Sequence, residues 1–224
     1  MLTIYFLKVF LFFFLCSSII SLMQFSKKLL FVILILLFSN LVCFALPENP
    51  FALNFSLGTS AIVYGDENIK LEKENYFTQD FSRFILNSEA SFQLFLDEYI
   101  AFNFGGIAGF DMFKNEKAEM FVLKYDIFSG IRIYPTGKGF NFGVDYVYGS
   151  YTNFLKVFEE QTEEKESSKK LKGEWSNGFR IVTEYNFIEL DTKITPALGC
   201  YWQNMPRLNG YDNSFVVYLK LSMR

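Results

Sequence analysis

Histidine is absent from this 224-residue sequence, and its absence removes whole classes of enzyme. Hydrolases that activate a nucleophile with an imidazole base need at least one histidine. Three cysteines are also too few for a disulfide framework or a thiolate metal site, because Cys16 and Cys43 lie in the apolar beginning of the chain and Cys200 stands alone. We therefore predict no catalytic residue, no metal ligand and no cofactor, and we do not expect an enzyme.

The chain also has little net charge. Its 21 Lys and Arg residues against 24 Asp and Glu residues give a net charge of −3, so there is no basic footprint for nucleic acid. The densest acidic cluster, Glu159, Glu160, Glu163 and Glu164, is interleaved with lysine and is typical of a solvated loop tip. A catalytic carboxylate pair or a calcium site is the alternative there, although the spacing matches no EF-hand.

What the chain has in abundance is aromatic residues, with 29 Phe and 13 Tyr against only 2 Trp. Between residues 139 and 151 they follow a period of two, which places large side chains on one face of an extended strand and small or polar ones on the other. This pattern recurs along the chain with too little polar surface to coat a water-soluble body. It predicts a closed barrel whose apolar face looks at lipid.

Two apolar runs, at residues 1–22 and 29–45, precede the aromatic part of the chain. The basic segment MQFSKK at 23–28, the apolar run after it and the small residues Cys43 and Ala45 predict a signal peptide at 23–45, cleaved after Ala45. Residues 1–22 are then an over-extended start upstream of the initiator Met23. The alternative is a membrane hairpin of the two runs. The mature barrel is expected to span residues 46–224.

Eight strands are predicted in the mature chain, each long enough to cross a membrane at a tilt. They form an all-β, antiparallel, up-and-down transmembrane barrel. The predicted strands are residues 51–64, 83–96, 99–112, 119–134, 139–151, 171–187, 190–202 and 211–223.

The connections between these strands alternate in length. The longer ones are residues 65–82, 113–118, 152–170 and 203–210, and the short ones are residues 97–98, 135–138 and 188–189. This alternation is typical of outer-membrane barrels with both termini on the periplasmic side. A soluble lipocalin-like carrier is the alternative, but it would have to fit the aromatic face into its lumen.

Charged side chains fall on the face opposite the aromatic one. Because an eight-stranded barrel has an interior that side chains just fill, and unpaired charges there are costly, we predict a plugged, salt-bridged lumen. A gated ion path through the same residues is the alternative. The predicted lumen charge network is Arg83, Glu89, Lys124, Asp126, Arg132, Asp145, Glu174, Arg180, Glu184, Lys193 and Lys220.

Further aromatic residues cluster near the strand ends. Rings of Tyr and Trp at the two lipid interfaces explain them, with a carbohydrate-stacking platform as the alternative. The predicted girdle residues are Tyr99, Tyr134, Tyr148, Trp175, Tyr185, Trp202 and Tyr211.

Two phrases, FALNFSLGTSAIVYG at residues 51–65 and ITPALGCYW at residues 194–202, together with the eight-strand pattern, resemble small outer-membrane barrels of the OmpA membrane domain, OmpX and OmpW type. The resemblance covers the whole mature chain. It implies location in the outer membrane of a diderm bacterium, contact with outer-membrane lipid and insertion by the barrel assembly machinery.

The function expected from these features is a structural or surface-interaction role of an adhesin-like kind. A host or envelope ligand would then bind the loops at residues 65–82 and 152–170. The alternative is a narrow, porin-like channel for ions or small apolar solutes.

Overall fold

A computed structural model describes residues 50–78, 80–137, 139–158, 167–187 and 194–223. The predicted leader, Lys193, the predicted turn at 188–189 and the acidic cluster at 159–164 lie outside these ranges. Within them, no helix is both long and apolar enough to cross a membrane.

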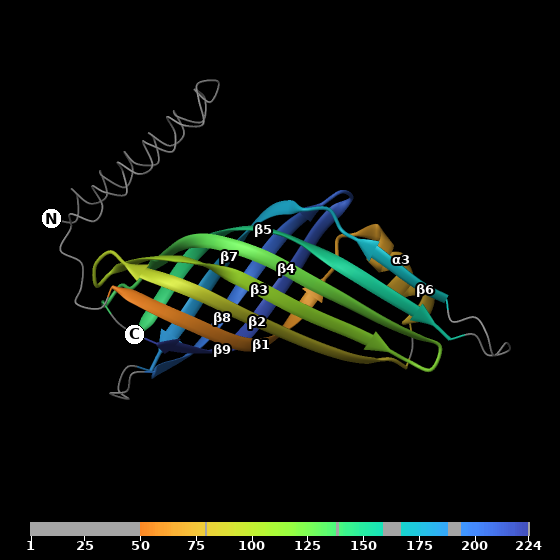
Figure 1. Ribbon diagram of the computed structural model, residues 1–224, viewed down its shortest axis with the longest axis horizontal. Coiled ribbons are helices and arrows are strands. Elements are labelled where there is room, and N and C mark those ends of the chain that lie inside the picture. Colours follow the sequence, from red (N-terminus) through yellow and green to blue (C-terminus); the bar gives the residue numbers. More distant parts are fainter. Residues whose placement is uncertain (1–49, 79, 138, 159–166, 188–193, 224) are drawn as a thin grey trace, which may run out of the picture. The chain divides into compact units, whose positions relative to one another are not determined.

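The described chain forms one closed antiparallel sheet, and the predicted fold class is confirmed (Figure 1). Eight strands make the ring, which closes where the first strand pairs with the last; β6 is a short extra strand that pairs with β5. The elements are β1 Phe51–Val63, α3 Glu67–Tyr76, β2 Ser82–Phe95, β3 Ile100–Lys114, β4 Ala118–Ile133, β5 Phe140–Val157, β6 Ser167–Lys172, β7 Ser176–Asn186, β8 Ile194–Arg207 and β9 Gly210–Met223.

The period of two in the sequence is the cause of the two faces of this barrel. On β9, Phe215, Val217, Leu219 and Leu221 are exposed on the outside, while the residues between them are buried inside. A sheet that turns its large apolar side chains outward and its polar ones inward inverts the arrangement of a soluble protein. The exterior is therefore a surface for lipid.

Short turns join strands at the end of the barrel where the C-terminus lies, as predicted (Figure 1). After β2, the side chain of Asp97 accepts hydrogen bonds from the backbone N–H groups of Tyr99 and Ile100. After β4, Gly137 adopts a φ of +73°, a conformation that favours glycine. These residues let the chain reverse within a few positions.

The other end differs from the prediction in three places. Residues 65–82 are not only a loop, because they contain α3. The predicted loop at 152–170 is largely strand, since β5 continues to Val157 and pairs with β6, so the predicted sixth strand starts at Ser176 and not at residue 171. The expected long connection at 203–210 is a two-residue turn, Leu208 and Asn209, because β8 continues to Arg207.

Candidate functional site

Glycines on β4 and β5 make room for charged side chains in the lumen. Directly opposite residues of antiparallel strands point to the same face, so a charge needs a small partner in a narrow barrel. A Cβ built on Gly149 would overlap the carboxylate of Asp126, which shows how tightly the two fit. Three such pairs follow one another along these strands: Asp126 with Gly149, Asp145 with Gly130, and Arg132 with Gly143.

A chain of ion pairs crosses the middle of the lumen. Arg132 forms a two-pronged pair with Asp145, with Nη1 donating to Oδ1 at 2.6 Å and Nη2 donating to Oδ2 at 2.9 Å. The Nε of Arg180 donates to the same carboxylate. The Nη1 of Arg180 then donates to Glu89 at 2.6 Å, on the far side of the ring. Charges that would be costly alone are thus compensated by partners from β2, β4, β5 and β7.

Two rings hold the guanidinium of Arg180 in place. Its carbon lies 3.7 Å from the ring centroid of Phe128 and 4.9 Å from that of Tyr201. Both rings belong to a buried interior cluster that also contains Val147 and Val182. Cation–π contacts of this kind strengthen when they are shielded from water, so the ion pairs and the apolar packing form one filling.

A second ion pair lies nearer the short turns. The ammonium of Lys220 contacts Glu184, and the hydroxyl of Tyr218 donates to the same carboxylate at 2.6 Å. Asn141 donates to Glu184 at 3.3 Å. The carboxylate therefore has donors from β5 and β9 around it and stays compensated inside the barrel.

A third layer of charge lies toward the opposite mouth. Asp111 accepts hydrogen bonds from the hydroxyl of Tyr64 at 2.6 Å and from Arg83 Nη2 at 2.7 Å. Asp212 accepts from Arg207 Nε and from the backbone N–H of Gly65, both at 2.7 Å. These contacts tie the segment just after β1 to β2, β3, β8 and β9.

Between these layers lies a small cavity of about 10 Å³, enough for about one water molecule. Lys124 and Asp126 line it, and Gln203 donates to Asp126 at 2.9 Å. The ammonium of Lys124 lies 5.0 Å from the ring centroid of Tyr64. Charged, polar and aromatic side chains therefore surround this cavity on several sides.

The helix α3 covers the mouth above the third layer (Figure 1). Its sequence explains it, because the Asp66 side chain caps the N-terminus by accepting from the N–H of Asn68, and good helix formers follow. Ile69 and Glu72 share its buried face, where Ile69 packs in an apolar cluster with residues of β3, β4 and β5. The carboxylate of Glu72 accepts from Asn153 of β5 and from Lys169 of β6, the latter at 3.0 Å.

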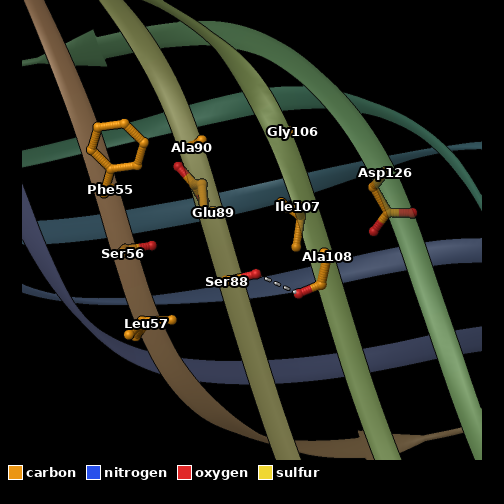
Figure 2. A pocket seen from close by; sticks show the side chains of 10 residues that line it. All are labelled: Phe55, Ser56, Leu57, Ser88, Glu89, Ala90, Gly106, Ile107, Ala108 and Asp126. Atoms are coloured by element: carbon orange, nitrogen blue, oxygen red, sulfur yellow. Dashed lines mark hydrogen bonds between the residues drawn. The ribbon is translucent and has the colours of Figure 1, made fainter.

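One larger pocket, of about 570 Å³, lies at the wall formed by β1 to β4 (Figure 2). Small outward residues, among them Ala90, Gly106 and Ala108, leave a recess there in a face that is otherwise bulky. Glu89 and Asp126 line its inner side but are already bonded to Arg180 and Gln203. Its polar lining residues already have partners, so lipid hydrocarbon is expected to fill the recess.

The structure brings most of the predicted lumen residues together, with two exceptions. Glu174 is exposed in the connection after β6, where its carbonyl accepts from Arg207. Lys193 lies outside the described residues. The balance remains even within the described chain: Arg83, Lys124, Arg132, Arg180, Arg207 and Lys220 accompany Glu89, Asp111, Asp126, Asp145, Glu184 and Asp212.

Three of these charges are not among the residues of the predicted network. The alternation puts Asp111 and Asp212 on the polar face of the predicted strands 99–112 and 211–223, and the structure places both in the lumen. Arg207 was assigned to a loop, and extending the alternation of β8 past Trp202 would have placed it inside. Of the predicted girdle, Tyr134 is also different, because it is buried and its hydroxyl accepts from Gln93. The other six are exposed on the outside: Tyr99, Tyr148, Trp175, Tyr185, Trp202 and Tyr211.

The tight glycine positions give a first testable prediction. A Cβ at Gly130 would lie 2.1 Å from the carbonyl oxygen of Val144 and 2.2 Å from Asp145 Oδ1, so Gly130→Ala is expected to lower the free energy of unfolding by about 1–3 kcal/mol. The matched control is Gly106→Ala on the outward face, where the nearest atom would be 3.6 Å away. Urea unfolding in vesicles measures both; equal stability of the two variants would contradict the packing described here.

Comparison with known proteins gives fold-level similarities only. No family model and no curated protein matches the chain. Neisserial surface protein A aligns with 78% of this chain and 97% of its own at 9% identity and a TM-score of 0.38. The attachment invasion locus protein Ail of Yersinia pestis aligns with 77% and 97% at 6% identity and 0.44. Outer membrane protein OprG of Pseudomonas aeruginosa aligns with 78% and 95% at 7% identity and 0.35.

The identity of the fold follows from the barrel itself. Its exterior is apolar, its interior is polar and ion-paired, and its backbone hydrogen bonds close into a ring, which is what a lipid bilayer demands of strands. Closed antiparallel barrels of this kind occupy the outer membranes of diderm bacteria. By its fold, then, this chain is an eight-stranded antiparallel transmembrane β-barrel, the architecture of small outer-membrane barrel proteins.

Proposed function

We propose that this barrel is a structural and surface-interaction protein that contacts ligands outside the membrane and does not conduct. The observation that carries the proposal is the contrast between its two parts. Ion pairs fill the lumen at three levels, whereas α3 and the β5–β6 hairpin build an ordered platform beyond the barrel mouth.

The platform is held together as one unit. Glu72 joins α3 to both strands of the hairpin, and Asn115, in the turn after β3, donates to the carbonyl oxygen of Tyr76 at 2.6 Å. Held in this way, the outer face of α3 is preorganised for binding, which lowers the entropy cost of contact with a host or envelope ligand. Insertion by the barrel assembly machinery and contact with outer-membrane lipid belong to the same proposal.

Labelling of intact cells tests this arrangement. In a Cys200→Ser background, Glu74→Cys on α3 is expected to react with a membrane-impermeant maleimide, because Glu74 is exposed on the platform. The control, Glu98→Cys, is also exposed but lies at the short turn after β2, so it should react only after the outer membrane is permeabilised. The reverse pattern would invert the topology and remove the surface role.

Conductance separates this function from the channel alternative. Purified protein in a planar bilayer is expected to pass no steady current, since ion pairs cross the lumen at three levels. Large, stable openings would show that ions pass through the side chains that fill the lumen, and would favour a porin-like function.

A further inference from the structure

The lysines of the short strand β6 lie on its two opposite faces. Opposite residues of antiparallel strands share a face, and the register sets Lys172 against Thr152 and Lys170 against Phe154. Phe154 has the outward parity of β5, so Lys170 and Lys172 lie on the outside. Lys169, between them, points to the other face and bonds Glu72 of α3. Lys169 therefore binds α3, whereas Lys170 and Lys172 face outward.

The two outward lysines continue the lipid-facing surface of the barrel. Below them on the same face lies an aromatic cluster, in which Trp175 stacks on Tyr148 at 4.9 Å and meets Tyr125 edge-on at 5.5 Å. Thr152, the partner of Lys172, is four residues beyond Tyr148, or about 13 Å along the strand. Rings of this kind mark the membrane interface, so the lysines lie at the depth of the lipid headgroups.

The charge of these lysines is not neutralised within the described chain. No carboxylate of the described residues lies within salt-bridge distance of Lys170 or Lys172, and both are exposed. The ammonium of Lys170 lies 5.0 Å from the ring centroid of Phe154. The result is a basic edge directly above an aromatic one.

We propose that Lys170 and Lys172, with Trp175 below them, form a binding surface for the phosphorylated headgroup of a lipid in the surrounding membrane leaflet. The ammonium groups pair with headgroup phosphates as point charges, while the aromatic cluster packs against the lipid where its acyl chains begin. This inference rests on the membrane location in the proposed function. It adds a lipid partner that contacts the side of the platform.

The position of the surface selects a lipid over a soluble anion. A soluble polyanion would be expected to meet charges on the exposed top of the platform. These lysines instead lie on the side of the wall, in line with the apolar band, where a membrane lipid is always adjacent. The site therefore combines charge with hydrocarbon contact, and both parts should contribute to binding.

The test compares lipids bound to the refolded full-length mature barrel in a neutral detergent, counted by native mass spectrometry. The probes are a diphosphorylated diglucosamine lipid, phosphatidylcholine, and the same phosphorylated disaccharide without acyl chains. The variant is Lys170→Gln with Lys172→Gln. The matched control is Lys70→Gln with Lys117→Gln, which removes two exposed lysines elsewhere on the platform side of the barrel.

The apparent affinity for the diphosphorylated lipid is expected to fall roughly 30-fold in the Lys170 and Lys172 variant and to stay within about twofold of wild type in the control. Phosphatidylcholine should not distinguish the proteins. An unchanged affinity in the variant would overturn the proposal, as would equally tight binding of the disaccharide without acyl chains. Surface labelling and conductance remain independent of these residues, so a failure here is distinguishable from a failure of the proposed function.

Discussion

Asp145→Ala is expected to lower the free energy of unfolding by about 3–5 kcal/mol, among the largest effects of any single substitution in this barrel. Its carboxylate is bonded to both Arg132 and Arg180, and all three side chains are almost completely buried. Removing it takes from Arg132 its ion pair with this carboxylate and leaves Arg180 with Glu89 as its remaining ion-pair partner. The desolvation cost of those cations is then no longer offset.

Equilibrium urea unfolding in phospholipid vesicles measures this effect. Trp175 and Trp202 both lie on the exterior, so their fluorescence reports the loss of lipid contact. Glu98→Ala is the control, because it removes an exposed carboxylate and should change stability by less than about 0.5 kcal/mol. If Asp145→Ala unfolded at the same urea concentration as the control, the lumen would have to be hydrated and the plug would be lost.

Leu219→Arg is expected to destabilise the barrel in a bilayer by about 2–4 kcal/mol. Leu219 is 68% exposed on the outward face of β9, within the apolar row from Phe215 to Leu221, between Leu57 of β1 and Leu198 of β8. A charge there must enter hydrocarbon if the exterior faces lipid. In a water-soluble barrel the same substitution would be nearly neutral.

The control for this substitution is Leu71→Arg on α3, another leucine that is more than half exposed. Because the outer face of α3 points to water in the proposed topology, this variant should insert and unfold like wild type. Folding into vesicles, followed by the heat-dependent shift of barrel mobility on a denaturing gel, reports both. Normal insertion of Leu219→Arg would contradict the lipid-facing exterior.

Much of the wall could be predicted from the sequence, because its cause is local. Side chains alternate along any extended strand, so Phe142 and Phe215 were placed outside, and Arg132 and Glu184 inside, without knowledge of their neighbours. The short turn after β2 was equally local, since Asp97 bonds the backbone within three residues. The platform was less visible, although Asp66 and the spacing of Ile69 and Glu72 carried a helix signal.

The sequence by itself determined that each strand has an apolar face and a polar or charged face, and which residues belong to each. Only the tertiary structure decided which charges meet. Arg180 pairs with Glu89, which is 91 residues away in the sequence, and Lys169 pairs with Glu72, which is 97 residues away. Such contacts cross the lumen or its mouth, where partners depend on the strand register and tilt that close the ring. An alternation along one strand contains no information about that closure.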